Sequence, residues 1–406
     1  MRDIRVQLGS IEAEKLLVSR DSVRPQSKGF INPALVFISK DPKFAHFVQP
    51  FQEQLTRSVW EIDDVDVFDM AKELTSVPEL KDRCYFFVDF QVTESLGVLN
   101  MLVTVKADNG RQLWRSDVKR VDVSDHDQSD RLLEVLSRQT CHALLELWRP
   151  DKGHVSRNLP LAMFSRSFRE AFSFSRPSLQ SADKLIRLAY SQNLNPICLA
   201  WQAFLRNTAM FEHLTVDFLE ERDNEVLIAT AQSEAPDNSF VLALAAQHSL
   251  VNRQDVEYGK FLCERAIDIN SSNTLAWAFM SNIHSMNNNY SEALRAAEIA
   301  VQLSQGHPLQ NFVRIFRCMA LIGMNKIEPA MLDAQFASAI NPEYQAIRRY
   351  LLASSLVVGR NDIAVKTLRE IRTREPMFRK AEFLNEDYPV GTLRSMPIVD
   401  RLVTAV

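Results

Sequence analysis

The chain has 406 residues, of which 46% are hydrophobic and 24% charged, and its formal net charge is −4 at pH 7. Such a length exceeds one ordinary hydrophobic core, so we expect two or three domains of a soluble globular protein. Acidic and basic residues are mixed along the chain. This excludes the dominant basic field of a protein that binds nucleic acid through its phosphates, and we expect no direct nucleic-acid binding by this chain.

The cysteine content and the apolar runs indicate a cellular compartment. The five cysteines are far apart in the sequence: Cys84, Cys141, Cys198, Cys263 and Cys318. Their spacing favours reduced, mostly buried thiols over a metal knuckle or a redox pair. No run approaches the roughly 18 apolar residues of a membrane span, and the first residues lack the apolar stretch of a secretory signal. We therefore expect a cytoplasmic protein with no membrane span.

Residues 1–32 predict an arm or a linker. Ser10 is suited to cap a short helix, and the stretch that follows, RDSVRPQSKGFINP, mixes proline, serine, glycine and charge. This composition is typical of a linker.

Residues 33–150 predict a compact α/β domain that opens with alternating strands and helices. A short apolar run at 34–38 predicts a buried strand, and helical spacing over 44–59 predicts a helix that Pro50 should kink or split. Alternation over 60–68 predicts a second strand, followed by a helix over 69–80. The acids between the apolar residues of that strand are interpreted as its solvated face: Glu61, Asp63, Asp64, Asp66 and Asp69.

Three closely spaced strands and a helix complete this predicted domain. The strands are expected at 83–92, 97–107 and 111–123. Asp108-Asn109-Gly110 separates the last two, and Asn-Gly favours a tight hairpin turn because both residues tolerate positive φ. Leucines at helical spacing over 125–148 predict an amphipathic closing helix.

Residues 151–180 form a connecting segment with a row of aromatic residues. Phe164, Phe168 and Phe172 are four residues apart, which places them on one helix face, and arginines surround them. Such a row could bind nucleic acid or an acidic partner, or it could dock a connecting helix on the protein's own core. We favour the second interpretation.

Residues 181–376 predict stacked helix pairs. Pro342 and Pro376 are 34 residues apart, and Ala330 and Ala364 each precede one of these prolines by twelve residues. Small alanines would let the two helices of a pair approach closely, and each proline would set the turn to the next pair. Residues 377–406 are expected to cap the last pair. The expected fold class is therefore α+β/α multidomain, with a small mixed α/β sandwich followed by an all-α solenoid.

Both halves of the chain resemble known families. The 34-residue recurrence resembles the tetratricopeptide repeat. The stretch LVTVKADNGRQLW, with Gly110, Leu113 and Trp114 after an aspartate-containing turn, resembles the TolB-amino-terminal-like domain of bacterial regulators. The resemblance covers roughly residues 33–380 and implies a role in signalling or transcriptional control. Family members usually carry a winged-helix DNA-binding domain or a nucleotide-cyclase domain ahead of this pair, and this chain carries neither.

The sequence offers no constellation for catalysis. The eight histidines are scattered, and the chain has no nucleophile elbow, P-loop or dinucleotide fingerprint. We therefore expect no enzyme, no catalytic residue, no cofactor and no metal.

The expected function is partner binding. An inner groove lined by the first helix of each pair is the usual place to bind a peptide. Ten side chains are expected to be exposed there: Gln247, Asn252, Asn282, Ser285, Asn311, Arg314, Arg317, Arg348, Arg349 and Ser354. From these we select a candidate groove: Asn282, Asn311, Arg314, Arg317, Arg348 and Arg349. The four arginines could clamp an acidic peptide. Alternatively, they form ion pairs on a solvated face with Glu343, Asp362 or Glu370.

Two hypotheses follow for the whole chain. The first is a non-enzymatic bacterial regulatory or adaptor protein that binds a protein or peptide partner through this groove, with a homo-oligomer as a further option. The second is a transcription regulator or an adenylate-cyclase-like signalling component whose DNA-binding or catalytic module is on a partner or lost.

Overall fold

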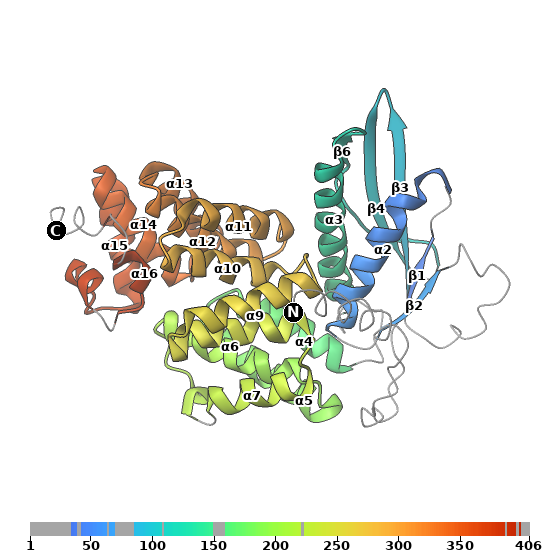
Figure 1. Ribbon diagram of the computed structural model, residues 1–406. Helices are drawn as coiled ribbons and strands as arrows, with labels where there is room; N and C mark the ends of the chain where they lie inside the picture. Colours follow the sequence, from blue (N-terminus) through green and yellow to red (C-terminus); the bar gives the residue numbers. More distant parts are fainter. Residues whose placement is uncertain are drawn as a thin grey trace, which may run out of the picture.

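A mixed sheet backed by helices is followed by a long array of helices in the computed structural model (Figure 1). The structure describes residues 34–38, 42–62, 65–69, 85–107, 109–148, 159–220, 223–385, 388–394 and 398. Several segments discussed in the sequence analysis lie wholly or almost wholly outside these residues: the expected arm at 1–32, the expected helix at 69–80, Cys84 and the end of the expected cap. The α+β layout followed by an all-α layout agrees with the expected fold class.

The sheet is parallel on one side and antiparallel on the other. Its strands are β1 (Ala34–Phe37), β2 (Asp66–Asp69), β3 (Tyr85–Ser95), β4 (Val98–Lys106), β5 (Gln112–Arg115) and β6 (Lys119–Asp122). The order is β2-β1-β3-β4-β5, with β6 also paired to β4. The strand expected over 111–123 is therefore two short strands that pair with successive parts of β4. Gly110 has a positive φ, as the expected hairpin requires.

Helices α2 (Ala45–Trp60) and α3 (His126–Leu147) pack against each other, and α3 also contacts β4. Pro50 lies inside α2 without splitting it, because proline removes one backbone hydrogen bond and the helix continues beyond it. The strand expected over 60–68 begins only at Asp66. Trp60 still belongs to α2, and its indole Nε1 donates to the carbonyl oxygen of Val65 (2.6 Å). The expectation of a strand at Glu61 is therefore wrong.

Helix α4 (Leu159–Ala171) carries the predicted aromatic row into the core. Phe164, Phe168 and Phe172 are buried. The ring of Phe168 lies 4.9 Å from that of Trp201, and the ring of Phe172 lies 5.5 Å from that of Phe312. The row therefore docks α4 on the protein's own helices, as favoured from the sequence.

The helical array alternates inner and outer helices. It begins with α5 (Arg176–Asn193). The inner helices are α6 (Ile197–Phe211), α8 (Ser239–His248), α10 (Thr274–Met286), α12 (Leu309–Gly323) and α14 (Gln345–Val358). The outer helices are α7 (Asn224–Glu234), α9 (Val256–Ile269), α11 (Tyr290–Leu303), α13 (Ile327–Ile340) and α15 (Asn361–Arg374). Each inner helix packs on the next inner helix and on its outer neighbours.

Alanines allow this close packing. The alanines that mark the repeat are all buried: Ala266, Ala293, Ala300, Ala330, Ala337 and Ala364. Every residue of α8 is buried as well. A helix that is apolar all round belongs inside a protein, and α4 covers part of the inner helices where an open groove was expected.

Asparagines in the turns before the inner helices join the array to the rest of the chain. We call Asn195, Asn238, Asn270 and Asn341 the turn asparagines. Each side-chain oxygen accepts a backbone N–H from within its own turn. Each amide nitrogen donates to a residue outside the turn. Asn195 donates to the carbonyl oxygen of Ile62 (2.8 Å), Asn238 to the carbonyl oxygen of Glu61 (2.7 Å), and Asn270 to the carboxylate of Glu61 (2.7 Å). Asn341 donates to the carbonyl oxygen of Phe172 (2.8 Å). Three of the four thus hold the end of α2.

The chain after α15 folds back on the array. It includes a 3₁₀ helix (Lys380–Leu384) and α16 (Gly391–Arg394). Phe378, Phe383, Tyr388 and Leu393 are buried there, so this segment covers apolar surface, while its role as the cap of the last helix pair stays a prediction. Among the described helices, none is both long and apolar enough to cross a membrane.

Candidate partner-binding site

Most of the side chains expected to be exposed on the inner surface are buried. This is so for Gln247, Ser285, Asn311, Arg348, Arg349 and Ser354. Asn282, Arg314 and Arg317 are partly buried, and only Asn252 is exposed. The expectation of exposure is therefore wrong for six of the ten, because inner helices pack on both neighbours and on α4. Partner binding by the six groove residues stays a prediction.

Two of the predicted clamp arginines hold a carboxylate of this chain. Arg314 and Arg317 bind the two oxygens of Asp333 on α13, the second at 2.9 Å. Asp333 is itself buried. The guanidinium of Arg314 also lies 4.4 Å from the centre of the Phe336 ring, a distance at which a cation is attracted to a ring face. The two arginines therefore bind a carboxylate, as expected, but this carboxylate belongs to the same chain and not to a partner.

Arg348 has partners on its own and the next helix. Its guanidinium donates to the side-chain oxygen of Gln345 (3.1 Å) and lies 3.7 Å from Glu370 on α15. Glu370 is one of the three acids expected for the ion-pair alternative. Asn311 lies in α12 and Asn282 in α10, so the structure does not bring the six residues into one clamp.

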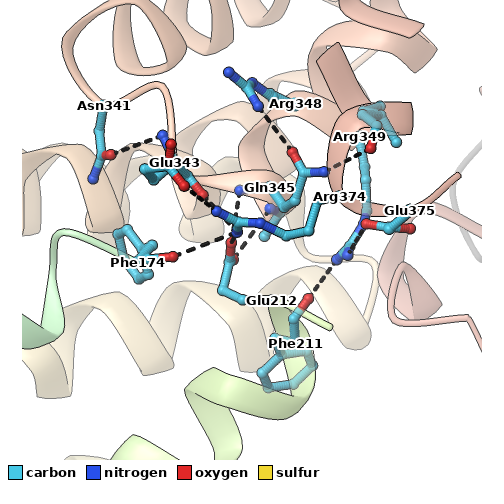
Figure 2. A network of polar contacts seen from close by, with 12 residues as sticks. Phe174, Phe211, Glu212, Asn341, Glu343, Gln345, Arg348, Arg349, Arg374 and Glu375 are labelled. Atoms are coloured by element: carbon cyan, nitrogen blue, oxygen red, sulfur yellow. Dashed lines mark hydrogen bonds and ion pairs between the residues drawn. The ribbon is translucent and has the colours of Figure 1, made fainter. Parts of the chain in front are cut away.

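Arg349 is fully buried in a polar network between α14 and the chain on either side of it (Figure 2). Its guanidinium donates to Glu375 (2.7 Å), to the Tyr388 hydroxyl (2.7 Å) and to the carbonyl oxygen of Phe211 (2.5 Å). The Tyr388 hydroxyl donates to the second oxygen of Glu375 (2.6 Å). Because all of these groups are satisfied internally, Arg349 holds the C-terminal segment and the end of α6 to α14.

Glu212 completes this network and was not singled out from the sequence. The buried Glu212 carboxylate accepts the backbone N–H groups of Gln345 (2.6 Å) and Ala346 (3.2 Å), and Arg374 lies 3.6 Å away (Figure 2). Burial raises the pKa of Glu212 to about 7, against the lowering effect of Arg349 and of the two N–H donors. The network is a structural closure of the array rather than an open ligand site.

A pair of buried histidines lies where α3 meets the array. The rings of His142 and His307 stack with their centres 4.1 Å apart. Burial lowers the pKa of both, and it lowers that of His307 to about 3. Within the described ranges, no group of three or more His, Cys, Asp or Glu side chains could hold a metal ion.

Three exposed apolar side chains lie in a row on α13. Leu332, Phe336 and Ile340 are 58%, 48% and 54% exposed. They are four residues apart and therefore form one row along the helix, which we call the outer row. Sequence reasoning missed it, although Ile327–Ile340 is apolar on more than one helix face. The helix thus has more apolar residues than one buried face can hold, and this excess is the feature of the sequence that could have predicted the outer row.

No protein-family model matches the chain, and no curated protein matches it at a significant level. The resemblance to TolB-amino-terminal-like domains and tetratricopeptide repeats therefore stays a prediction. A mixed sheet followed by helix pairs is the layout that this resemblance implies.

Proposed function

We propose that the chain is a non-enzymatic adaptor or regulatory protein, acting in signalling or transcriptional control, whose helical array binds a protein partner. The observation that supports this proposal is the outer row of α13. Single exposed apolar side chains are ordinary, but a continuous row on a regular surface helix is typical of a protein-binding site. The inner surface is a weaker candidate for a binding site, since most of its polar side chains are buried or paired with groups of the same chain.

Comparison with the equivalent outer helices supports the outer row as the partner-binding surface. Leu332 stands two residues after the repeat alanine Ala330. The residues at the same place after Ala293 and Ala364 are Arg295 on α11 and Lys366 on α15, both well exposed. The repeat architecture therefore accommodates a charged residue at this position, and folding does not require the leucine there. A binding role accounts for it.

The test is affinity purification of the full chain from its own cells. A Leu332→Ser/Phe336→Ser variant should lose specific partner proteins. A Phe261→Ser variant, which changes a half-exposed phenylalanine of α9, should keep them. Circular dichroism would verify that both variants are folded. A partner list that is the same for wild type and both variants would refute the proposal.

A further inference from the structure

The surroundings of the outer row differ in charge on its two sides. The α15 side carries three exposed basic residues, Lys366, Arg369 and Arg372. The two acids on α15 are engaged: Asp362 binds Arg360 (3.0 Å), and Glu370 lies 3.7 Å from Arg348 and 3.9 Å from Lys366. Two acids are therefore shared among three basic residues, and Arg369 and Arg372 add further positive charge to the exposed face of α15.

The α11 side is balanced instead. Arg295 binds Glu292, and Glu298 lies 3.9 Å from Arg317. Arg317 in turn shares Asp333 with Arg314. Each exposed charge on this side therefore has an opposite charge close by, and no excess of either sign faces a partner.

The basic face lies alongside the outer row. Helices α13 and α15 both pack against α14, which connects them, so they run in the same direction. Lys366 stands in α15 at the place that Leu332 holds in α13, two residues after the repeat alanine. Residues 366 and 369 therefore stand at about the level of Leu332 and Phe336, because the rise per residue is the same in both helices.

We propose that the outer row binds an acidic amphipathic helix of a protein partner. This inference rests on the proposed function and names the class of partner. The apolar side chains of such a helix, spaced by three or four residues, would pack between Leu332, Phe336 and Ile340. Acidic residues along one flank would face Lys366 and Arg369, where complementary charge orients the partner.

A second copy of this chain fits the surface less well. An antiparallel two-fold pairing through α13 would bring Leu332 against Ile340 of the other copy, which is acceptable. It would also set the basic face of α15 against the same face of that copy. Like charges opposed across an interface disfavour association.

The test uses a photo-crosslinking amino acid introduced at Gln335, an exposed residue of the α13 face between Leu332 and Phe336. The matched control carries it at Gln302, an exposed residue of α11. Crosslinked peptides from cells are identified by mass spectrometry. We expect adducts at Gln335, and not at Gln302, with a segment that has apolar residues at helical spacing and net negative charge. A synthetic peptide of that segment should bind the full chain about tenfold more weakly when Lys366→Glu and Arg369→Glu are combined.

The outcomes separate this inference from the proposed function. Adducts with a neutral or basic segment, or peptide binding that the charge reversal leaves unchanged, would overturn the acidic helix and leave protein binding intact. Adducts only with a second copy or only with lipid would overturn both. Equal protein adducts at Gln335 and Gln302, or none at Gln335, would overturn both as well.

Discussion

Glu212 caps a helix that begins at Gln345, 133 residues later in the sequence, with its carboxylate 2.6 Å from the backbone nitrogen of Gln345. The first N–H groups of a helix have no partner within the helix, and a negative charge is favourable at that end. A side chain from the turn after α6 thus satisfies the start of α14. This contact ties the first part of the array to the last.

The Glu212→Gln substitution should remove a pH dependence of stability. The folded-state pKa of Glu212, about 7, exceeds its ordinary value of 4.5. The folded state therefore binds this proton more tightly, and its contribution to stability is lost as the pH rises through about 7. The free energy of unfolding of the wild type, relative to the variant, should fall by about 3 kcal/mol between about pH 4.5 and about pH 7.

Urea unfolding of both proteins at several pH values would measure this difference. Other titrating groups are common to both proteins and cancel in the comparison. A wild-type-minus-variant difference that stays constant over this pH range would contradict the raised pKa of Glu212.

The Arg349→Met substitution should destabilise the protein by about 3–5 kcal/mol, because it leaves the buried Glu375 carboxylate without its cation. Arg360→Met is the matched control, since it breaks an exposed ion pair with Asp362 and should cost about 1 kcal/mol or less. Chemical unfolding measures both. Similar losses for the two variants would show that the Arg349 network contributes no more than a surface pair.

The Asn238 side chain makes two separable contacts. Its oxygen caps α8 by accepting the Val241 N–H (3.0 Å), and its nitrogen donates to Glu61. Asn238→Ala should cost about 2 kcal/mol by losing both, whereas Asn238→Ser should cost about 1 kcal/mol because serine keeps the cap. Hydrogen exchange at the end of α2 should increase in both variants. Equal unfolding free energies for the serine variant and the wild type would exclude a stabilising contact to Glu61.

Two phenylalanines should behave differently although both belong to helical rows. Phe168→Ala should cost about 3–5 kcal/mol because the side chain is buried against Trp201 and Phe240. Phe336→Ala should cost about 1 kcal/mol or less because the ring is half-exposed. Thermal unfolding of the two variants tests this. A large loss for Phe336→Ala would assign the outer row to folding rather than to binding.

The periodic parts of the fold could be predicted from the sequence because their signals are local. The spacing of Phe164, Phe168 and Phe172 defines one helix face wherever the helix docks, and the alanine and proline spacings mark helix pairs. The sequence predicts a start of β2 that is too early, because acids alternate with apolar residues just after Trp60. The alternation there comes from a turn that is held by the array and not from a sheet.

The candidate site was harder to predict because its contacts are distant in the sequence. Arginine on a helix usually indicates exposure, and the burial of Arg349 is made tolerable by its contacts with Glu375, Tyr388 and the Phe211 carbonyl. Nothing in the sequence around residue 349 indicates those partners. Leu332 and Phe336, in contrast, look like core residues from the sequence alone, and the structure places them outside.

The turn asparagines also restrict how this chain could change its length. Asn195, Asn238 and Asn270 come from the turns before three successive inner helices, and all reach the Glu61–Ile62 end of α2. Insertion or deletion of a helix pair between α6 and α10 would carry at least one of these turns out of reach. The α/β domain therefore fixes the number of helix pairs in this part of the array. Insertion of a helix pair between α12 and α14 would likewise break the contacts of Asn341 with Phe172 and of Gln345 with Glu212.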